Sequence, residues 1–306
     1  MNKTKIILDC DPGHDDAIAL LLSSYSPKIE LLAVTTCAGS QTIEKTSRNA
    51  LNLLNYFNKG DIPLAKGSTN PLTRPILTCP EIHGESGLDG FIFPEYKEKY
   101  DSRPGYQLII DTLLSNEEVT MVTTGPMTNL ALAIQHNPSI LSHIKEIVLM
   151  GGSLTEGNMT KHAEFNILVD PEAADICFNS GVPLRMLGLN VTRQILVNEK
   201  VMEEASKIHT KGGDLFIKLM KVFNENQRKF FGLSAAPLHD PATIISLIND
   251  KAFEFEDYNV SIDTSFSETE GKTICNKSKP YNCKVATKVN LDEYWKEIYE
   301  HLRRCN

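Results

Sequence analysis

The sequence has 306 residues, of which 41% are hydrophobic and 23% charged, and its net charge is -8. The length suits one large α/β domain, and the composition is that of an ordinary globular protein. The negative balance, without any run of five like charges, argues against a nucleic-acid-binding surface, but it is compatible with a small neutral substrate.

The seven cysteines are scattered and contain no Cys-x-x-Cys pair. This pattern predicts reduced thiols rather than a disulfide framework or a zinc site. The N-terminus lacks the apolar segment of a signal peptide, and no apolar stretch approaches the ~20 residues of a membrane span. We therefore expect a cytoplasmic protein with no membrane partner.

The first informative stretch, Asp9–Asp16, holds four aspartates in eight residues. It follows Ile6–Leu8, which predicts a buried strand, and precedes Ala17–Leu22, which predicts a buried helix. The acids thus lie on a loop at the carboxyl end of the first strand, where open α/β sheets bind ligands. Asp9 and Asp11 are two positions apart and are expected on one strand face.

Four neighbouring carboxylates repel one another, and a helix dipole offsets only a few tenths to ~1 kcal/mol of that repulsion. A bound hard cation such as Ca²⁺ or Mg²⁺ would offset it, because such ions select oxygen ligands. A helix cap with solvated charge is the alternative; for four acids at this spacing we favour the ion site.

The remaining elements alternate between strand and helix. Strands are expected at 29–36, 62–65, 119–124, 144–150 and 183–189, with short β segments within 253–289. Helices are expected at 41–58, 104–116, 127–136, from 170 onward, two or three between about 198 and 249, and around Trp295 at the end of the chain. This alternation predicts a single α/β domain over residues 1–306, an open, mostly parallel twisted sheet with helices on both faces. Mobile active-site loops are expected near 67–103 and 223–238.

Polar clusters on three further strand-to-helix loops would converge with the acidic stretch at one sheet edge. Together with that stretch they resemble, in order along the chain, the motifs of the inosine–uridine nucleoside hydrolase family. The matching segments are Asp9–Ala17; Thr124–Ala131; Met150–Gly152 with Gly157-Asn158, Ala163–Asn166 and Asp170–Ala174; and His239–Pro241.

The resemblance implies hydrolysis of the N-glycosidic bond of a ribonucleoside to ribose and base, a bound Ca²⁺, and a homodimer or homotetramer. The residues that it implies fall into three groups. Asp11, Asp16, Asp240 and the backbone carbonyl of Thr124 would hold the ion; Asp15, Asn158, Glu164 and Asn166 would bind ribose; and His83 and His239 would face the base.

Chemical reasoning adds roles to some of these residues. Asp11 can accept a proton from an ion-bound water and is expected to be the general base. His239, beside Asp240, suits protonation of the leaving base because an imidazole titrates near neutrality. For His83, the surface or core interpretation and the base-facing one are nearly even.

Three other positions concern the substrate. Ser40 stands where the family commonly has Asn, so the ribose contact expected there is lost, water-bridged or altered. Phe231 either packs in the core or stacks on the base, and Gln227, one turn earlier, would bond a pyrimidine edge. The single tryptophan, Trp295, excludes a base held between two tryptophans.

Base preference stays open between pyrimidine, broad inosine and uridine, and a modified base such as 7-deazapurine. Two other functions are compatible with parts of the sequence. A haloacid-dehalogenase-type phosphatase also begins with Asp-x-Asp, but it needs Thr or Val where this chain has Gly13. A non-catalytic nucleoside-binding protein would be expected to lose Asp11 or the His239-Asp240 pair.

Overall fold

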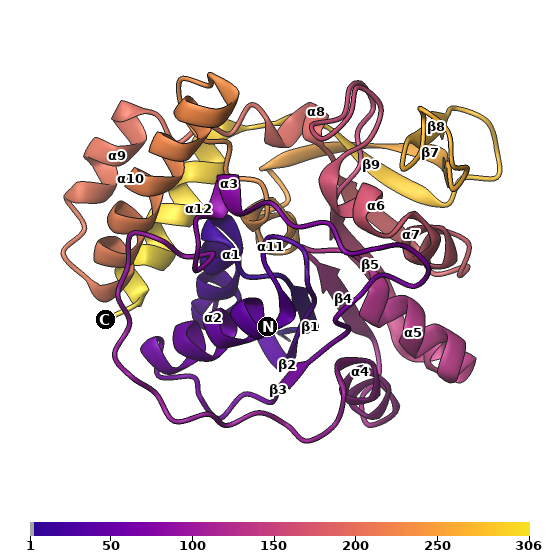
Figure 1. Ribbon diagram of the computed structural model, residues 1–306, viewed down its shortest axis with the longest axis horizontal. Coiled ribbons are helices and arrows are strands. Elements are labelled where there is room, and N and C mark those ends of the chain that lie inside the picture. Colours follow the sequence, from indigo (N-terminus) through magenta and orange to yellow (C-terminus); the bar gives the residue numbers. More distant parts are fainter. Residues whose placement is uncertain (1–2) are drawn as a thin grey trace.

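The computed structural model describes residues 3–306, in which strands and helices alternate along most of the chain (Figure 1). The strands are β1 (Thr4–Cys10), β2 (Ile29–Thr36), β3 (Leu64–Lys66), β4 (Val119–Thr123), β5 (Ile144–Met150), β6 (Leu184–Leu187), β7 (Phe253–Ile262), β8 (Thr273–Asn276) and β9 (Cys283–Val289). They form a nine-stranded sheet in the order β3-β2-β1-β4-β5-β6-β9-β7-β8.

The sheet is parallel from β3 to β9, and only β7 and β8 run antiparallel to their neighbours. The central strands contain apolar stretches such as Ile6–Leu8 of β1 and Ile147–Met150 of β5, as expected for strands buried on both faces. The prediction of a mostly parallel sheet is confirmed. The β segments expected within 253–289 are these two antiparallel strands together with β9.

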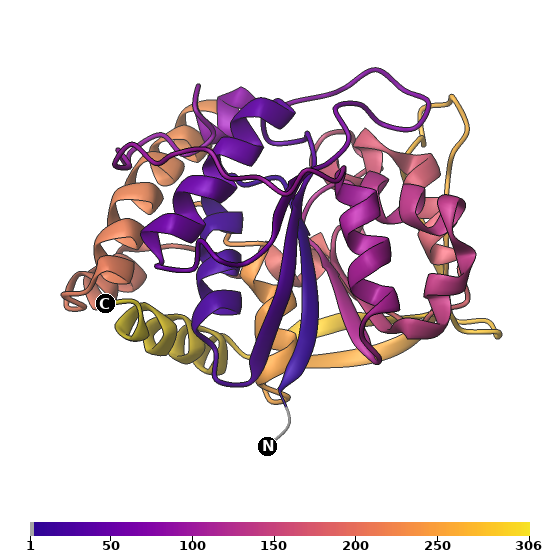
Figure 2. The ribbon, with the colours of Figure 1, turned by 90° about the horizontal axis from the view of Figure 1, so that it is seen from below.

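Helices cover both faces of the sheet (Figures 1 and 2). They are α1 (His14–Tyr25), α2 (Ile43–Tyr56), α3 (Pro80–His83), α4 (Gly105–Leu114), α5 (Thr128–His136), the 3₁₀ helix η1 (Pro138–His143), α6 (Phe165–Val169), α7 (Pro171–Phe178), α8 (Leu189–Thr192), α9 (Glu199–Ser206), α10 (Lys211–Phe231), α11 (Pro241–Ile248) and α12 (Leu291–Arg304). The short helices η1, α3, α6 and α8 were not expected from the sequence.

Side chains of β1 alternate between two apolar cores. Ile6 and Leu8 pack with α1, α10, α11 and α12, whereas Ile7 packs with α4, α5 and α7 on the other face. This alternation is the period of two of an extended strand. The two cores hold β1 rigidly from both sides, so the loop that follows it starts from a fixed point.

All seven cysteines are unpaired, as expected. No helix within residues 3–306 is long and apolar enough to cross a membrane. The segment 67–103 is irregular except for α3; its mobility, and that of 223–238, remain predictions.

Candidate active site

The strand order reverses at the carboxyl end of β1, because β2 and β3 lie on one side of it and β4, β5 and β6 on the other. Ligands bind in open α/β sheets at such a point. A cavity of about 580 Å³ lies here, and it is lined by residues from loops far apart in the sequence. It contains every residue that the sequence predicted for the site: Asp11, Asp15, Asp16, Ser40, His83, Thr124, Asn158, Glu164, Asn166, Gln227, Phe231, His239 and Asp240.

Three buried carboxylates form the tightest cluster in the cavity. Asp15 and Asp16 belong to the first turn of α1, and Asp240 is the N-cap of α11; their ligand atoms lie within 4.8 Å of one another. α1 and α11 pack together, which brings these distant residues side by side. The set expected from the family resemblance has Asp11 where this cluster has Asp15.

Asp11 lies beside the cluster and is fixed by the neighbouring loop. Its Oδ2 accepts a hydrogen bond from the Ser40 backbone N–H at 2.5 Å, and the Ser40 hydroxyl donates to the Asp11 backbone carbonyl. A Cβ on Gly39 would lie 2.3 Å from Oδ2, and one on Gly125 would lie 2.5 Å from Oδ1. Glycine at both positions therefore makes room for the carboxylate, and Ser40 holds Asp11.

Burial raises the pKa of all four carboxylates, that of Asp15 to about 7. Repulsion between the carboxylates adds to the effect of burial. The charge of Asp16 raises the pKa of both Asp11 and Asp15, and the charges of all three raise the pKa of Asp240. Within residues 3–306, no lysine or arginine forms an ion pair with any of them. A hard divalent cation with oxygen ligands fits this site, since it would supply the missing positive charge.

Thr124 follows β4 and contacts both sides of the site. Its hydroxyl donates to Asp16 Oδ1 at 2.7 Å, and its backbone carbonyl accepts from Asn166 Nδ2 at 2.8 Å. A carbonyl oxygen has two lone pairs. The Thr124 carbonyl can therefore take part in an ion site while it keeps this hydrogen bond.

Glu164 and Asn166 are buried at the start of α6. Glu164 is the N-cap: Oε2 accepts from the N–H groups of Gly152 and Ile167, and Oε1 accepts from that of Asn166. Burial raises the pKa of Glu164 to about 7, and its backbone donors oppose the rise. Asn158 is exposed at the cavity wall, and its Oδ1 accepts from the Phe165 N–H at 2.9 Å.

His83 is buried at the end of α3. Its Nδ1 accepts from the His14 N–H at 3.2 Å, and its ring stacks with the rings of His14 and Phe223 at centroid distances of 5.6 and 5.5 Å. A Cβ on Gly13 would lie 2.5 Å from Nδ1, so only glycine admits the ring. Burial lowers the pKa of His83 well below its usual value, which keeps the imidazole neutral.

His239 lies across the cavity, where its Nδ1 contacts the Thr192 hydroxyl at 2.7 Å. Enclosure by protein lowers the pKa of His239 to about 3, and the charge of Arg193 adds to this effect, although part of the ring stays open to the cavity. This differs from the near-neutral titration expected from the sequence. The reason is that a charged imidazole would lose its hydration here.

Asp9 lies outside the cavity, although it belongs to the acidic stretch. β1 ends at Cys10, so the alternation that predicted a shared face for Asp9 and Asp11 does not extend to Asp11. Asp9 Oδ1 accepts from the Thr35 hydroxyl at 2.6 Å and from Asn129 Nδ2 at 2.8 Å. Asp9 therefore links β1 to β2 and α5 and does not face the cavity.

Sequence reasoning missed Thr192, Arg193 and Phe223, which contact the predicted site residues or line the cavity. The only signal for Thr192 and Arg193 is their place shortly after the sixth strand, at the edge where the other loops converge. Phe223 carries no such signal, because it is one of several apolar residues on the inner face of α10.

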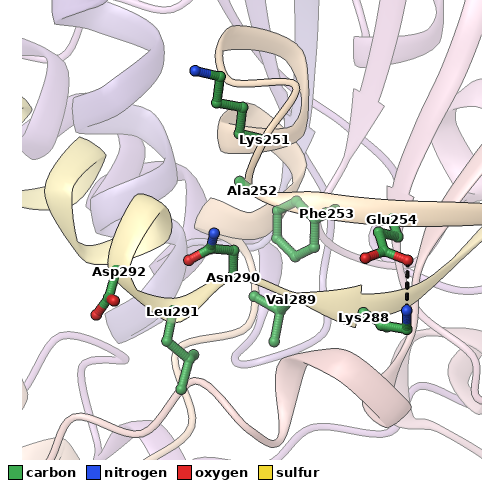
Figure 3. Close-up of a pocket in the computed structure, with 9 residues that line it drawn as sticks. All are labelled: Lys251, Ala252, Phe253, Glu254, Lys288, Val289, Asn290, Leu291 and Asp292. Atoms are coloured by element: carbon green, nitrogen blue, oxygen red, sulfur yellow. Dashed lines mark hydrogen bonds and ion pairs between the residues drawn. The ribbon is translucent and has the colours of Figure 1, made fainter.

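A second cavity, of about 480 Å³, lies where β9 leads into α12 (Figure 3). Its lining includes Phe253, Val289 and Leu291, and the ion pair between Glu254 and Lys288 crosses one side (Figure 3). It contains none of the residues predicted for the site. The predicted catalytic and binding residues therefore lie at the first cavity and not at the second.

Known proteins with sequences similar to this chain are named as nucleoside hydrolases. A family model described as inosine-uridine preferring nucleoside hydrolase matches residues 6–296. Pyrimidine-specific ribonucleoside hydrolase RihB of Shigella flexneri serotype 5b (strain 8401) is 39% identical over 308 residues, an alignment that covers 99% of this chain and 98% of that protein. The same figures hold for RihB of Escherichia coli (strain K12 / DH10B).

Solved structures agree with the sequence comparison. The plant nucleoside hydrolase PpNRh1 has a TM-score of 0.91 at 29% identity, with 98% of this chain and 99% of that chain covered. A purine-preferring ribonucleoside hydrolase from Gardnerella vaginalis has a TM-score of 0.90 at 30% identity, with the same coverage. The resemblance drawn from the motifs is confirmed, and the phosphatase alternative is wrong. The chain belongs to the inosine–uridine preferring nucleoside hydrolase family.

Proposed function

We propose that this enzyme hydrolyses the N-glycosidic bond of ribonucleosides with a Ca²⁺ ion held by Asp11, Asp16, Asp240 and the Thr124 carbonyl. The observation that carries the proposal is one cavity that joins buried acids to polar groups and to aromatic rings. Repulsion among the acids supports a bound divalent cation. Flexible carboxylate and carbonyl ligands favour Ca²⁺ over zinc, which prefers nitrogen and sulfur.

When bound, such an ion supplies an oriented water of lowered pKa. Asp11 is the proposed general base that takes the proton of this water, because its carboxylate is fixed by the Ser40 N–H at the cavity wall. Asp15, Asn158, Glu164 and Asn166 are proposed to bind the ribose hydroxyls. They would hold C1′ in line with the attacking water, which makes the reaction effectively intramolecular.

The base leaves as its bond to C1′ breaks. In the free protein His239 is a neutral imidazole oriented by Thr192. We propose that it takes up a proton from solvent as negative charge develops on the base, and that it passes this proton to the leaving base. His83, Gln227 and Phe231 are proposed to face the base. Gln227 is 5% exposed, and its amide offers both a donor and an acceptor.

We further propose a preference for pyrimidine ribonucleosides. The support is the 39% identity to relatives named pyrimidine-specific and the amide of Gln227, which can bond the edge of uracil or cytosine. A broad inosine and uridine preference, or a modified base such as 7-deazapurine, is the alternative. We also propose that the protein is cytoplasmic and that it forms a homodimer or homotetramer. Light scattering would test the oligomeric state.

A panel of ribonucleosides tests the function directly. Release of reducing sugar is measured with uridine, cytidine, inosine, adenosine and a 7-deazapurine ribonucleoside in the presence of Ca²⁺. We expect kcat/KM for uridine and cytidine to exceed that for inosine by at least about tenfold, which corresponds to about 1.4 kcal/mol. A purine or 7-deazapurine at the top of the ranking would overturn the pyrimidine preference alone.

The Asp11→Asn variant tests the proposed general base. It should lose most of the activity, whereas Asp292→Asn, the same chemical change at an exposed residue, should not. If the wild type releases no ribose from any member of the panel yet binds nucleosides, the non-catalytic alternative replaces the hydrolase proposal.

A further inference from the structure

Arg193 is the only lysine or arginine among the described residues that line the cavity. It follows α8 directly and is exposed. Its guanidinium donates to two successive backbone carbonyls, from Nη1 to Glu156 at 3.3 Å and from Nη2 to Gly157 at 2.5 Å. Arg193 therefore ties α8 to the segment 151–164, which we call the 151–164 loop.

The tip of this loop folds back onto its own end. The Asn158 N–H donates to the Ala163 carbonyl at 3.1 Å, and Asn158 Oδ1 accepts from the Phe165 N–H at 2.9 Å. A Cβ on Gly157 would lie 2.1 Å from the Ala163 carbonyl oxygen, so only glycine permits this approach. The position of Asn158 thus depends on where the tip is held.

Other contacts hold the two ends of the 151–164 loop. At its start, the Ser153 N–H donates to the Thr273 hydroxyl at 2.9 Å, and that hydroxyl donates to the Ser153 carbonyl at 2.7 Å. At its end, Glu164 is fixed as the N-cap of α6. The tip lies between these anchors, and Arg193 reaches it from outside the loop.

We propose that Arg193 is a positioning residue for ribose binding, an inference that rests on the proposed hydrolase function. Its two hydrogen bonds hold the tip in the position in which Asn158, together with Glu164, can bind the ribose. Hydrogen bonds to a charged donor are stronger than neutral ones, and a planar guanidinium can bond two carbonyls at once, which an ammonium cannot do in the same geometry.

The proposal predicts a particular kinetic signature. Arg193 acts through a residue that holds the sugar, and the sugar is held both before and during bond breaking. Loss of such uniform binding raises KM and leaves kcat nearly unchanged. A group that contacted only the transition state would instead lower kcat.

The test compares Arg193→Gln, Arg193→Lys and Lys161→Gln with the wild type, using the best ribonucleoside of the panel. Lys161 is an exposed residue of the same loop, so its substitution removes the same charge. We expect Arg193→Gln to raise KM about tenfold with kcat within about threefold of wild type, Arg193→Lys to fall between the two, and Lys161→Gln to match the wild type.

A second readout does not require activity. Freeing the tip should speed tryptic cleavage after Lys161 in Arg193→Gln by about threefold or more, because local opening exposes the backbone, and mass spectrometry locates the cut. An unchanged KM in Arg193→Gln, a loss confined to kcat, or an equal effect of Lys161→Gln would overturn the proposal. A wild type that releases no ribose would refute the proposed function instead, while the cleavage result would still report on the tip.

Discussion

Glu164 shows how burial and backbone donors compete at a single residue. The carboxylate is almost fully buried as the N-cap of α6, and burial raises its pKa from 4.5 to about 7. A raised folded-state pKa means that the folded protein binds the proton more tightly than the unfolded chain. The stability contributed by Glu164 is therefore fully present below about pH 4.5 and is lost as the pH rises to about 7.

The Glu164→Gln substitution should remove this part of the pH dependence. Between pH 4.5 and 7 the wild type should lose on the order of 3 kcal/mol relative to the variant, whatever constant cost the lost cap adds. Thermal unfolding of both proteins in chelator, measured at several pH values, gives the difference curve. Glu156→Gln, at an exposed position of the 151–164 loop, is the control, and parallel curves for Glu164→Gln and wild type would contradict the prediction.

The sequence predicted residues that line one cavity, but it did not predict their contacts. Aspartates at the end of a strand carry a local signal, and each predicted residue does line the cavity. At Ser40 the sequence left open whether the ribose contact is lost, water-bridged or altered, and the hydrogen bonds of this residue go to Asp11. Such pairing joins two loops of different strands, and its geometry is set by the sheet and not by the nearby sequence.

At the scale of elements, Arg74 joins three segments that are distant in the sequence. It is buried within the irregular segment 67–103 and forms ion pairs with Glu172 of α7 at 2.7 Å and with Glu270 of the β7–β8 turn at 2.5 Å. It also donates to the Thr264 carbonyl at 3.0 Å. The antiparallel hairpin at the edge of the sheet (Figure 1) is thereby attached to the body of the protein.

Replacing Arg74 by methionine should destabilise the protein without removing activity. Breaking a buried ion pair costs about 3–5 kcal/mol, and the partial exposure of the two glutamates reduces this to about 2–3 kcal/mol. We expect the Tm to fall by about 5 °C or more, with kcat/KM within about threefold since Arg74 does not line the cavity. Arg103→Met, which breaks more exposed ion pairs, should have less than half this effect; an equal effect would show that burial is not the cause.

Elements with strong periodicity were predictable, whereas short ones were not. The strands β1, β2, β4 and β5 each contain an apolar stretch, and each lies at the segment where the sequence predicted a strand. The helix α3 lies within a segment rich in Pro and Gly, and α8 has only four residues. Elements this short are stabilised by their tertiary contacts rather than by local propensity, so no window of the sequence reveals them.

For the molecule as a whole, the candidate ion site joins the start of the chain to α11, a helix far along the sequence. Asp11 and Asp16 lie just before and within the first turn of α1, and Asp240 caps α11, the helix that packs against α1. Both helices also belong to one apolar core with α10 and α12. An ion held by these acids would consequently stabilise the packing of that entire face, while an empty site would leave like charges buried within it.

Calcium should therefore raise the stability of the whole molecule, and increasingly so at higher pH. A ligand at 100 times its Kd adds about 2.7 kcal/mol, or about 5 °C in Tm for a chain of this size. Burial raises the pKa of Asp15 from 3.8 to about 7 in the ion-free state, so the acids lose their protons and repel one another as the pH rises through that window. The Tm difference between Ca²⁺ and chelator should be small at pH 5 and largest at pH 8.

The Asp240→Asn variant separates this effect from unspecific ion binding. Removal of one of the mutually repelling charges should raise the Tm in chelator above that of wild type, while the gain on adding Ca²⁺ and the release of ribose are both lost. Asp292→Asn, an exposed carboxylate, should keep the wild-type response. A full Ca²⁺ response in Asp240→Asn would exclude Asp240 as a ligand, because a site that binds equally well without that carboxylate does not depend on it.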